Sequence, residues 1–250
     1  MSGHNKWAKI KRKKGVNDAK RGRLFTRLIK EMTIAARDGG GNPAGNPRLR
    51  LAIEKAQAAN MPAENIKRAV QRGTGELPGV TYEEVSYEGY GPGGVAMIIE
   101  SVTDNKNRTV AELRHLLEKY NGKLGAANSV AWMFHRKGII RIPRAGYNED
   151  DLLGIILDAG ADDMKVDEEG YEIVTAPEAF ESVRHALEKK NIKMEEAEVQ
   201  RIPENLVKVE GKDAEQVLKL HEALEDNEDV QHVYANFDID EKVMAAMNVE

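Results

Sequence analysis

The order of predicted elements in the second half of the chain is the feature that most constrains its fold. Between residues 138 and 202, the apolar spacing alternates between that of a strand and that of a helix. The order is β-α-β-β-α-β, the ferredoxin-like arrangement, in which helices cover one face of an antiparallel sheet. The predicted strands are 138–143, 163–167, 171–175 and 195–202, and the predicted helices are 149–159 and 177–190.

The segments on either side of this unit are incomplete alone. Two strands and a helix precede it, and a β-α-β segment follows it, at 81–88, 95–102, 105–121, 206–209, 213–226 and 230–237. Neither segment has enough layers to bury its own sheet. Joined, they make nearly a second ferredoxin-like unit, so the later unit is predicted to be inserted into the earlier one.

The first third of the chain reads as helical. Amphipathic helices are predicted at 17–37, 47–60 and 62–73, with glycines and Asn-Pro pairs between the first two. Asn46 is placed to cap the second helix, with Pro47 at its first position. We therefore predict an α+β multidomain chain in three parts: a basic tail and three-helix domain (1–76), a discontinuous α/β domain (77–131 plus 205–250), and an inserted ferredoxin-like domain (132–204).

Charge is distributed unevenly between these parts. Residues 1–75 contain 18 Lys+Arg and 5 Asp+Glu, a net charge of +13. The whole chain has 37 Lys+Arg and 42 Asp+Glu, so the remainder carries 19 and 37, a net charge of −18. This asymmetry points to a nucleic-acid surface at the basic end, and the acidic α/β domains offer a surface for a protein partner.

Within the first helix, Phe25, Leu28 and Met32 mark an apolar face, and the basic residues lie on the opposite side. A basic tail and a basic helix face are typical of phosphate binding, although such a charge run is also typical of a solvated surface. Trp7 either stacks on a base or anchors the tail to its own domain. The predicted nucleic-acid-binding residues are Lys6, Trp7, Lys9, Lys11, Arg12, Lys13, Lys14, Lys20, Arg21, Arg23, Arg27 and Lys30.

Composition excludes several classes of protein. The chain has no cysteine, so disulfides, thiolate metal sites and a cysteine nucleophile are excluded. No apolar segment follows the basic N-terminus as in a secretory signal, and no apolar run is long enough to span a membrane. We expect a cytoplasmic protein without cofactor, metal or small-molecule substrate.

Three motifs suggest other chemistry, and each has a simpler interpretation. Gly89-x-Gly91-x-x-Gly94 matches the dinucleotide fingerprint in letters, but a strand follows it instead of a helix, so a hairpin turn is predicted. The acidic stretches 162–163 and 167–169 are either a cation site or a solvated strand end and turn. None of the six histidines has metal-ligand spacing.

Two further features leave alternatives open. Asp104, at the end of an apolar strand, allows the alternative of a Mg²⁺-dependent nuclease. Against an enzyme, no nucleophile and base can be paired by their spacing in the sequence. We therefore expect a non-enzymatic protein. Trp132 and Phe134 are expected in a core or at a domain junction.

Many ordered stretches of this chain resemble the YebC family, and together they cover nearly its whole length. They are Gly3-His4-x-Lys6-Trp7 with Lys9 and Ile10, Lys20-Arg21-Gly22, Phe25-Thr26, Asn46-Pro47-Arg48-Leu49-Arg50, Ala59-Asn60-Met61-Pro62, Asn65-Ile66, Arg72-Gly73-Thr74-Gly75, Tyr87-Glu88-Gly89-Tyr90-Gly91-Pro92-Gly93-Gly94, Thr103-Asp104-Asn105 with Asn107-Arg108-Thr109, and Gly125-x-x-x-Ser129-Val130.

The resemblance implies three domains and a cytoplasmic DNA-binding transcriptional regulator. It also implies kinship with mitochondrial translational activators and a link to relief of ribosome stalling at proline runs. The second implication makes ribosomal RNA the alternative partner. No recognition helix rich in base-reading side chains is evident in residues 1–76, and this favours recognition of RNA by shape and phosphate.

Overall fold

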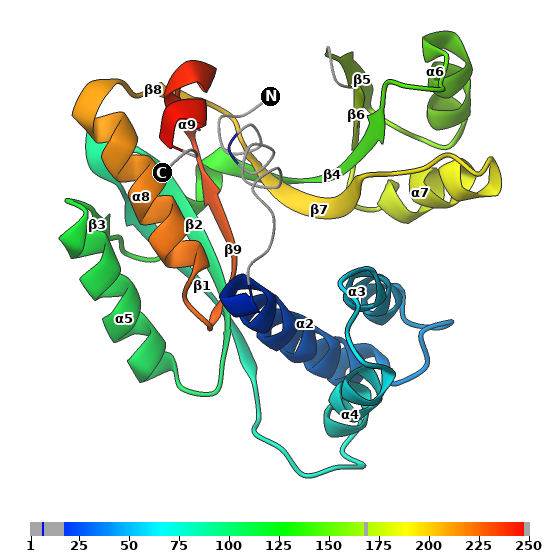
Figure 1. Ribbon diagram of the computed structural model, residues 1–250, viewed down its shortest axis with the longest axis horizontal. Helices are drawn as coiled ribbons and strands as arrows, with labels where there is room; N and C mark the ends of the chain where they lie inside the picture. Colours follow the sequence, from blue (N-terminus) through cyan, green and yellow to red (C-terminus); the bar gives the residue numbers. More distant parts are fainter. Residues whose placement is uncertain (1–6, 8–17, 168–169, 248–250) are drawn as a thin grey trace. The chain divides into compact units, whose positions relative to one another are not determined.

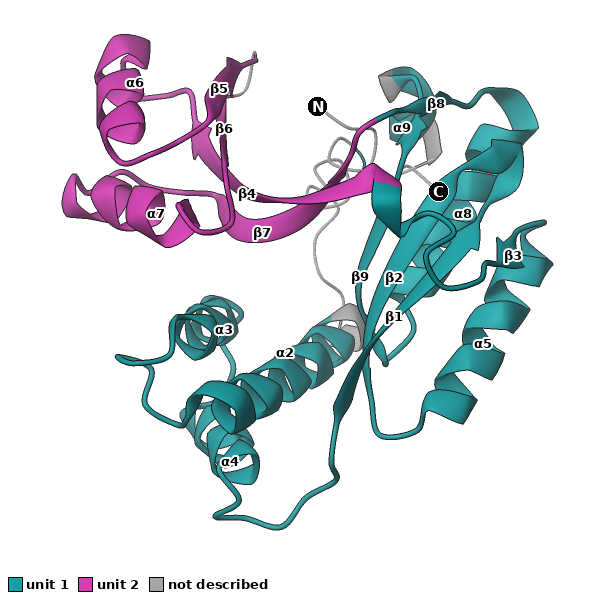
Figure 2. Ribbon diagram, turned by 180° about the vertical axis from the view of Figure 1, so that it is seen from behind, with its two compact units in different colours: residues 1–132, 205–250 teal, residues 133–204 magenta. Residues whose placement is uncertain are grey.

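The computed structural model describes residues 7, 18–167 and 170–247. It shows a mixed α+β chain in which N-terminal helices are followed by antiparallel sheets (Figure 1). The chain divides into two compact units (Figure 2). Unit 1 contains residues 1–132 and 205–250, and unit 2 contains residues 133–204.

Residues 18–73 of unit 1 form three helices, α2 (Asp18–Gly39), α3 (Pro47–Ala58) and α4 (Ala63–Gly73). Asn46 caps α3 by accepting a hydrogen bond from the Leu49 backbone, and its side-chain amide donates to the Ala35 carbonyl of α2 at 2.7 Å. Asn46 thus starts α3 and fixes it to α2.

These helices bury a small aliphatic core that includes Leu28, Met32, Leu49 and Ala69. Helix α4 packs closely on α2 at Gly73, where a Cβ atom would lie 2.3 Å from the Thr33 carbonyl oxygen. A side chain at Gly73 would therefore push the two helices apart.

The α/β part of unit 1 contains a four-stranded sheet of order β3-β1-β2-β9, in which every neighbouring pair is antiparallel. Strands β8 and β10 form a separate, short parallel pair. The elements of this part are β1 (Glu83–Tyr90), β2 (Ala96–Thr103), α5 (Lys106–Lys119), β3 (Lys123–Leu124), β8 (Val207–Lys208), α8 (Gly211–Glu225), β9 (Val230–Ala235), β10 (Phe237–Asp238) and α9 (Glu241–Met247). Short 3-10 turns lie at Pro92–Gly94 and Ala131–Met133.

The glycine-rich motif between β1 and β2 closes a hairpin. Gly93 and Gly94 have positive φ angles of 68° and 77°, a conformation that side chains disfavour, and the Gly91 amide donates to the Val95 carbonyl at 2.8 Å. The predicted hairpin role is confirmed, since β1 and β2 pair directly across this turn.

Unit 2 contains β4 (Phe134–Pro143), α6 (Glu149–Asp158), β5 (Asp163–Val166), β6 (Gly170–Thr175), α7 (Phe180–Lys189) and β7 (Glu196–Pro203). The strand order is β5-β6-β4-β7, and every neighbouring pair is antiparallel. Ile140 and Ile173 share one core with Leu152 of α6 and Val183 of α7, so both helices pack on the same face of the sheet.

Short and irregular elements differ most from the sequence-based expectation. The two-residue strand β3 and helix α9 were not predicted, and the last predicted strand is interrupted at Asn236. The Asn236 side chain accepts a hydrogen bond from the Ala96 backbone at 2.8 Å, and the Asn236 backbone N–H donates to the Ala96 carbonyl at 3.2 Å. Trp132 is exposed and is the last residue before unit 2, whereas Phe134 is buried.

Candidate nucleic-acid interface

Half of the residues predicted to bind nucleic acid lie outside the part of the chain that the structure describes. These are Lys6, Lys9, Lys11, Arg12, Lys13 and Lys14. Lys20 lies in the first turn of α2, and Arg21 is exposed, with its guanidinium over the Phe25 ring at 5.5 Å. The structure therefore places Trp7 and the α2 cations.

Arg23, Arg27 and Lys30 lie four and three residues apart and so form one stripe along α2. We call these three the α2 stripe. The end of α8 and the following turn lie against it, and Arg23 Nη2 is 3.0 Å from Asp226 Oδ1. Lys30 Nζ donates to Asp229 Oδ1 at 2.7 Å and to the Glu228 carbonyl at 2.9 Å. The expectation that this face is presented to solvent is wrong for Lys30, which is buried.

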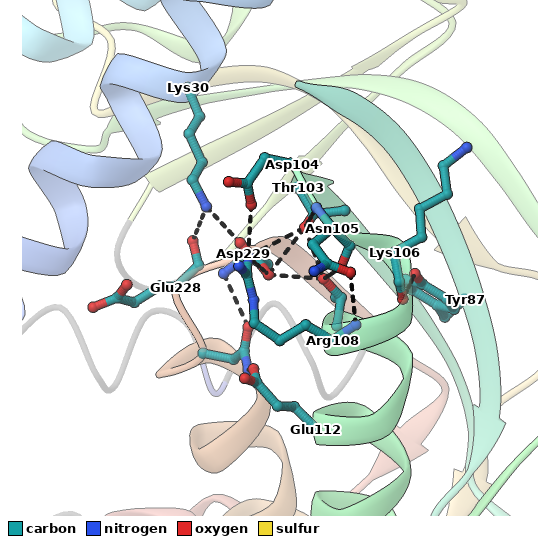
Figure 3. A network of polar contacts seen from close by, with 12 residues as sticks. Lys30, Tyr87, Thr103, Asp104, Asn105, Lys106, Arg108, Glu112, Glu228 and Asp229 are labelled. Carbon is teal, nitrogen blue, oxygen red and sulfur yellow. Dashed lines mark hydrogen bonds and ion pairs between the residues drawn. The ribbon is translucent and has the colours of Figure 1, made fainter. Parts of the chain in front are cut away.

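Lys30 belongs to a network centred on Asp229 (Figure 3). Arg108 Nη2 donates to Asp229 Oδ2 at 2.8 Å, and the hydroxyls of Thr109 and Thr103 lie 2.7 and 3.1 Å from the same oxygen. We call Lys30, Thr103, Arg108, Thr109 and Asp229 the Asp229 network. It joins α2 to the end of β2, the start of α5 and the residue before β9.

Local capping positions the members of this network. Asn105 caps α5 by accepting from the Arg108 backbone at 3.1 Å, which orients the first turn of that helix. Asp104 pairs with Arg108 at 2.8 Å, one helical turn apart. Asn227 accepts from the Asp229 backbone, whose carbonyl in turn accepts from Val102 at the end of β2. Asp104 therefore lies beside the cation that holds Asp229.

The network also sets the protonation of its members. Burial acts to raise the pKa of Asp229, but hydrogen bonds from Lys30, Arg108 and Thr109 outweigh this effect and lower the pKa from 3.8 to about 2. The hydrogen bonds of Arg108 to Asp229 and Asp104 raise the pKa of its guanidinium. The central carboxylate therefore stays ionised at any pH near neutrality.

This lowered pKa predicts an acid-sensitive contribution to stability. Because folding depresses the pKa, the contribution of roughly 2 kcal/mol is fully present above about pH 5 and is lost as the pH falls towards 2. The difference in free energy of unfolding between wild type and Asp229→Asn should be constant from about pH 5 to 8 and shrink below that range. Urea unfolding at each pH measures it, and a pH-independent difference would contradict the assignment.

Arg27 is the least satisfied member of the α2 stripe. Burial lowers the pKa of its guanidinium, and the nearby charges of Glu225 and Asp226 act in the opposite direction. Its Nε atom is buried and has no hydrogen-bond partner in the described part of the chain. Arg27 is thus a partly desolvated cation facing two carboxylates.

Trp7 is placed in the interior of the protein and not on a basic surface. Only 3% of the residue is exposed, and it belongs to the same core as Val95, Phe237 and Met244. A ring buried in this way cannot stack on a base, so the base-stacking alternative is wrong. The expected anchor is wrong as well, because the core that contains Trp7 is that of the α/β part and not that of the three helices.

Helix α4 carries exposed cations that the sequence-based site did not include. Lys67, Arg68 and Arg72 are exposed along its outer side, and Arg68 pairs with Glu64 at 3.0 Å. Their spacing of one, four and five residues was the signal that could have identified them. Arg48 of α3, in contrast, is held by Glu31 of α2 and Glu84 of β1.

Two residues of the acidic stretches considered as cation sites have other partners, and Glu168 and Glu169 lie outside the described residues. Asp162 pairs with Lys137 at 2.9 Å, and Asp167 accepts from the Gly170 backbone in a turn. Among residues 7, 18–167 and 170–247, no group of three or more His, Asp or Glu is arranged to hold a metal ion. No helix in these ranges is long and apolar enough to cross a membrane.

Matches to known protein families extend over both units. Residues 5–76 match the family model described as the TACO1/YebC protein N-terminal domain, and residues 82–237 match the model described as the TACO1/YebC second and third domain. A probable transcriptional regulatory protein of Dictyoglomus turgidum is 55% identical over 249 residues, which cover 99% of this chain and all of the relative. One of Geobacter sulfurreducens is 57% identical over 244 residues, 98% of each chain.

A solved structure shows the same fold. The crystal structure of a conserved hypothetical protein from Aquifex aeolicus is 47% identical, with a TM-score of 0.81, and the match covers 89% of this chain and 92% of that one. Both family models match, and the two relatives are over 50% identical over 98% or more of their length. The chain therefore belongs to the TACO1/YebC family.

Proposed function

We propose that this protein is a nucleic-acid-binding regulatory factor. The observation that carries the proposal is the concentration of positive charge in the helical part, where residues 18–75 hold 12 Lys+Arg against 5 Asp+Glu in an otherwise acidic chain. Such a local excess of cations neutralises phosphates. The proposed contacts are the tail cations from Lys6 to Lys14, with Lys20, Arg21 and the exposed residues of α4.

Duplex DNA is the first proposed target. The relatives carry the name probable transcriptional regulatory protein. In addition, α3 and α4 are joined by only four residues, 59–62, a connection as short as that of a helix-turn-helix. Both observations fit a transcriptional regulator, and we propose that it acts in the cytoplasm.

Structured RNA, including that of the ribosome, is the second proposed target, and one observation favours it. The N-terminal residues of α4 are Ala63 and Glu64, where a recognition helix would place base-reading side chains. The exposed cations Lys67 and Arg72 come later in the helix and suit contacts to phosphate. Recognition by shape and phosphate is typical of RNA.

We further propose that unit 2 is a ferredoxin-like domain inserted into a second α/β domain. Its antiparallel strand order supports this, as does the way unit 1 resumes at residue 205. We propose that the acidic α/β surfaces contact protein and that the chain acts by binding and not by catalysis. Cleavage of nucleic acid that requires Mg²⁺ and disappears in Asp104→Ala would contradict the last point.

The binding test uses full-length protein with labelled duplexes of DNA and of RNA. If six to ten phosphates are contacted, affinity should fall by roughly 10³–10⁵ between 50 and 200 mM salt. Replacing Lys11, Arg12, Lys13 and Lys14 with alanine should reduce the salt slope by about 3–4. The matched control replaces four exposed lysines of unit 2, Lys165, Lys189, Lys190 and Lys193, and should leave the slope nearly unchanged.

Crosslinking in cells then separates the two targets. Promoter DNA without ribosomal RNA would exclude the RNA target, and ribosomal RNA without promoter DNA would exclude the DNA target. Binding to neither nucleic acid at low salt would overturn the proposed function.

A further inference from the structure

We propose that Asp226 is an internal competitor of nucleic acid, occupying the place of a phosphate beside Arg23 and Arg27 until nucleic acid displaces it. The inference rests on the proposed function and adds a form of autoinhibition to it. It concerns the α2 stripe, which the sequence predicts to be a phosphate-binding surface and the structure shows in contact with carboxylates.

The contacts along the α2 stripe fall into two classes. In the Arg23–Asp226 pair, 27% and 42% of the two side chains are exposed, whereas the values are 8% and 5% in the Lys30–Asp229 pair. An exposed ion pair contributes little to stability and is screened by salt, so an external anion can replace it. A buried pair is costly to open. Nucleic acid would therefore exchange with Asp226 while Lys30 and Asp229 stay paired.

Arg27 gives a reason for the exchange to be favourable. It faces Glu225 and Asp226, yet its buried Nε has no hydrogen-bond partner within the described residues. A phosphate has more acceptor oxygens than a carboxylate, and arginine recognises phosphate through paired N–H donors. A phosphate beside Arg23 would thus bring acceptor oxygens close to Arg27, whose Nε donor the carboxylates leave unused.

The proposal predicts a distinctive salt dependence. In wild type, Arg23 exchanges one anion for another, so its contact with phosphate releases few counterions. In Asp226→Asn, Arg23 carries solvent counterions that binding releases, so the salt slope should become steeper by about 1. Affinity for a labelled duplex of about 20 base pairs should rise roughly three- to fivefold at low salt.

Two controls separate local competition from a change in net charge. Glu215→Gln removes the same charge from an exposed position of α8 and should leave the affinity and the salt slope close to those of wild type. In an Arg23→Ala background, Asp226→Asn should no longer increase affinity, because the cation that it releases is absent. Asp226 is half-exposed at the end of α8, so folding should survive, as far-UV circular dichroism checks.

Each outcome of this experiment either supports or overturns the proposed role of Asp226. A steeper slope and tighter binding in Asp226→Asn alone, abolished by Arg23→Ala, supports the proposal. Equal effects of Asp226→Asn and Glu215→Gln, or no effect of either, overturn it and leave the proposed function standing. If wild type and all variants fail to bind DNA and RNA, the proposed function is overturned together with this inference.

Discussion

Replacing Asp229 with asparagine is expected to lower the free energy of unfolding of this protein by about 3 kcal/mol. The carboxylate accepts from Lys30, Arg108 and Thr109 within 2.8 Å, and Lys30 is buried with it. Removing the negative charge leaves a buried ammonium group without its counter-ion, which costs more than the pair itself contributes. Urea unfolding at neutral pH measures the loss.

The matched control is Asp226→Asn, three residues earlier. Its pair with Arg23 is half-exposed, so the change should be within about 1 kcal/mol. A double-mutant cycle adds Lys30→Met, and the double variant should lose at least about 1 kcal/mol less than the sum of the two single losses. Equal losses for Asp226→Asn and Asp229→Asn would show that the Asp229 network does not hold α2.

Replacing Trp7 with alanine should cost about 3–5 kcal/mol, as expected for a large aromatic side chain removed from a core. Trp7 lies in the same core as Phe237 and Met244 although it comes from the far end of the chain. If Trp7 instead lay on a nucleic-acid-binding surface, its removal would change stability by less than about 0.5 kcal/mol. Thermal or urea unfolding distinguishes the two outcomes.

The chain contains two tryptophans, and this allows a direct check of burial. Trp132 is 64% exposed, so Trp132→Phe leaves only the buried indole and Trp7→Phe only the exposed one. The first variant should emit at shorter wavelength and resist quenching by iodide, and the second should be quenched readily. Trp132→Ala is the stability control and should cost little. Easy quenching of Trp7 would contradict its place in the core.

Helix α2 shows what the local sequence pattern can and cannot predict. The amphipathic pattern of α2 correctly separated Leu28 and Met32 from the cations, because a helix of fixed period determines which side chains share a face. The pattern does not say what a polar face meets. Lys30 and Asp229 are 199 residues apart in the chain, and no local spacing reveals that pairing.

Capping and turn signals were more informative because their physics is local. Asn46, the predicted cap, precedes a helix and accepts a hydrogen bond from its first turn, and Gly93 and Gly94 adopt the positive φ angles that a tight hairpin favours. The same local patterns gave the element order of unit 2. Two-residue strands such as β3 have too few residues to show any period and were missed.

By itself, the amino-acid sequence determined the mixed α+β class, most helices and strands, and the separation of a basic end from an acidic remainder. Only the tertiary structure decided that Trp7 is buried, that Asp229 holds Lys30 and Arg108, and that Asp226 lies beside Arg23. The physical reason is the distance along the chain over which each effect acts. Helix period, capping and turn geometry act over a few residues, whereas burial and ion pairing depend on which distant segments fold together.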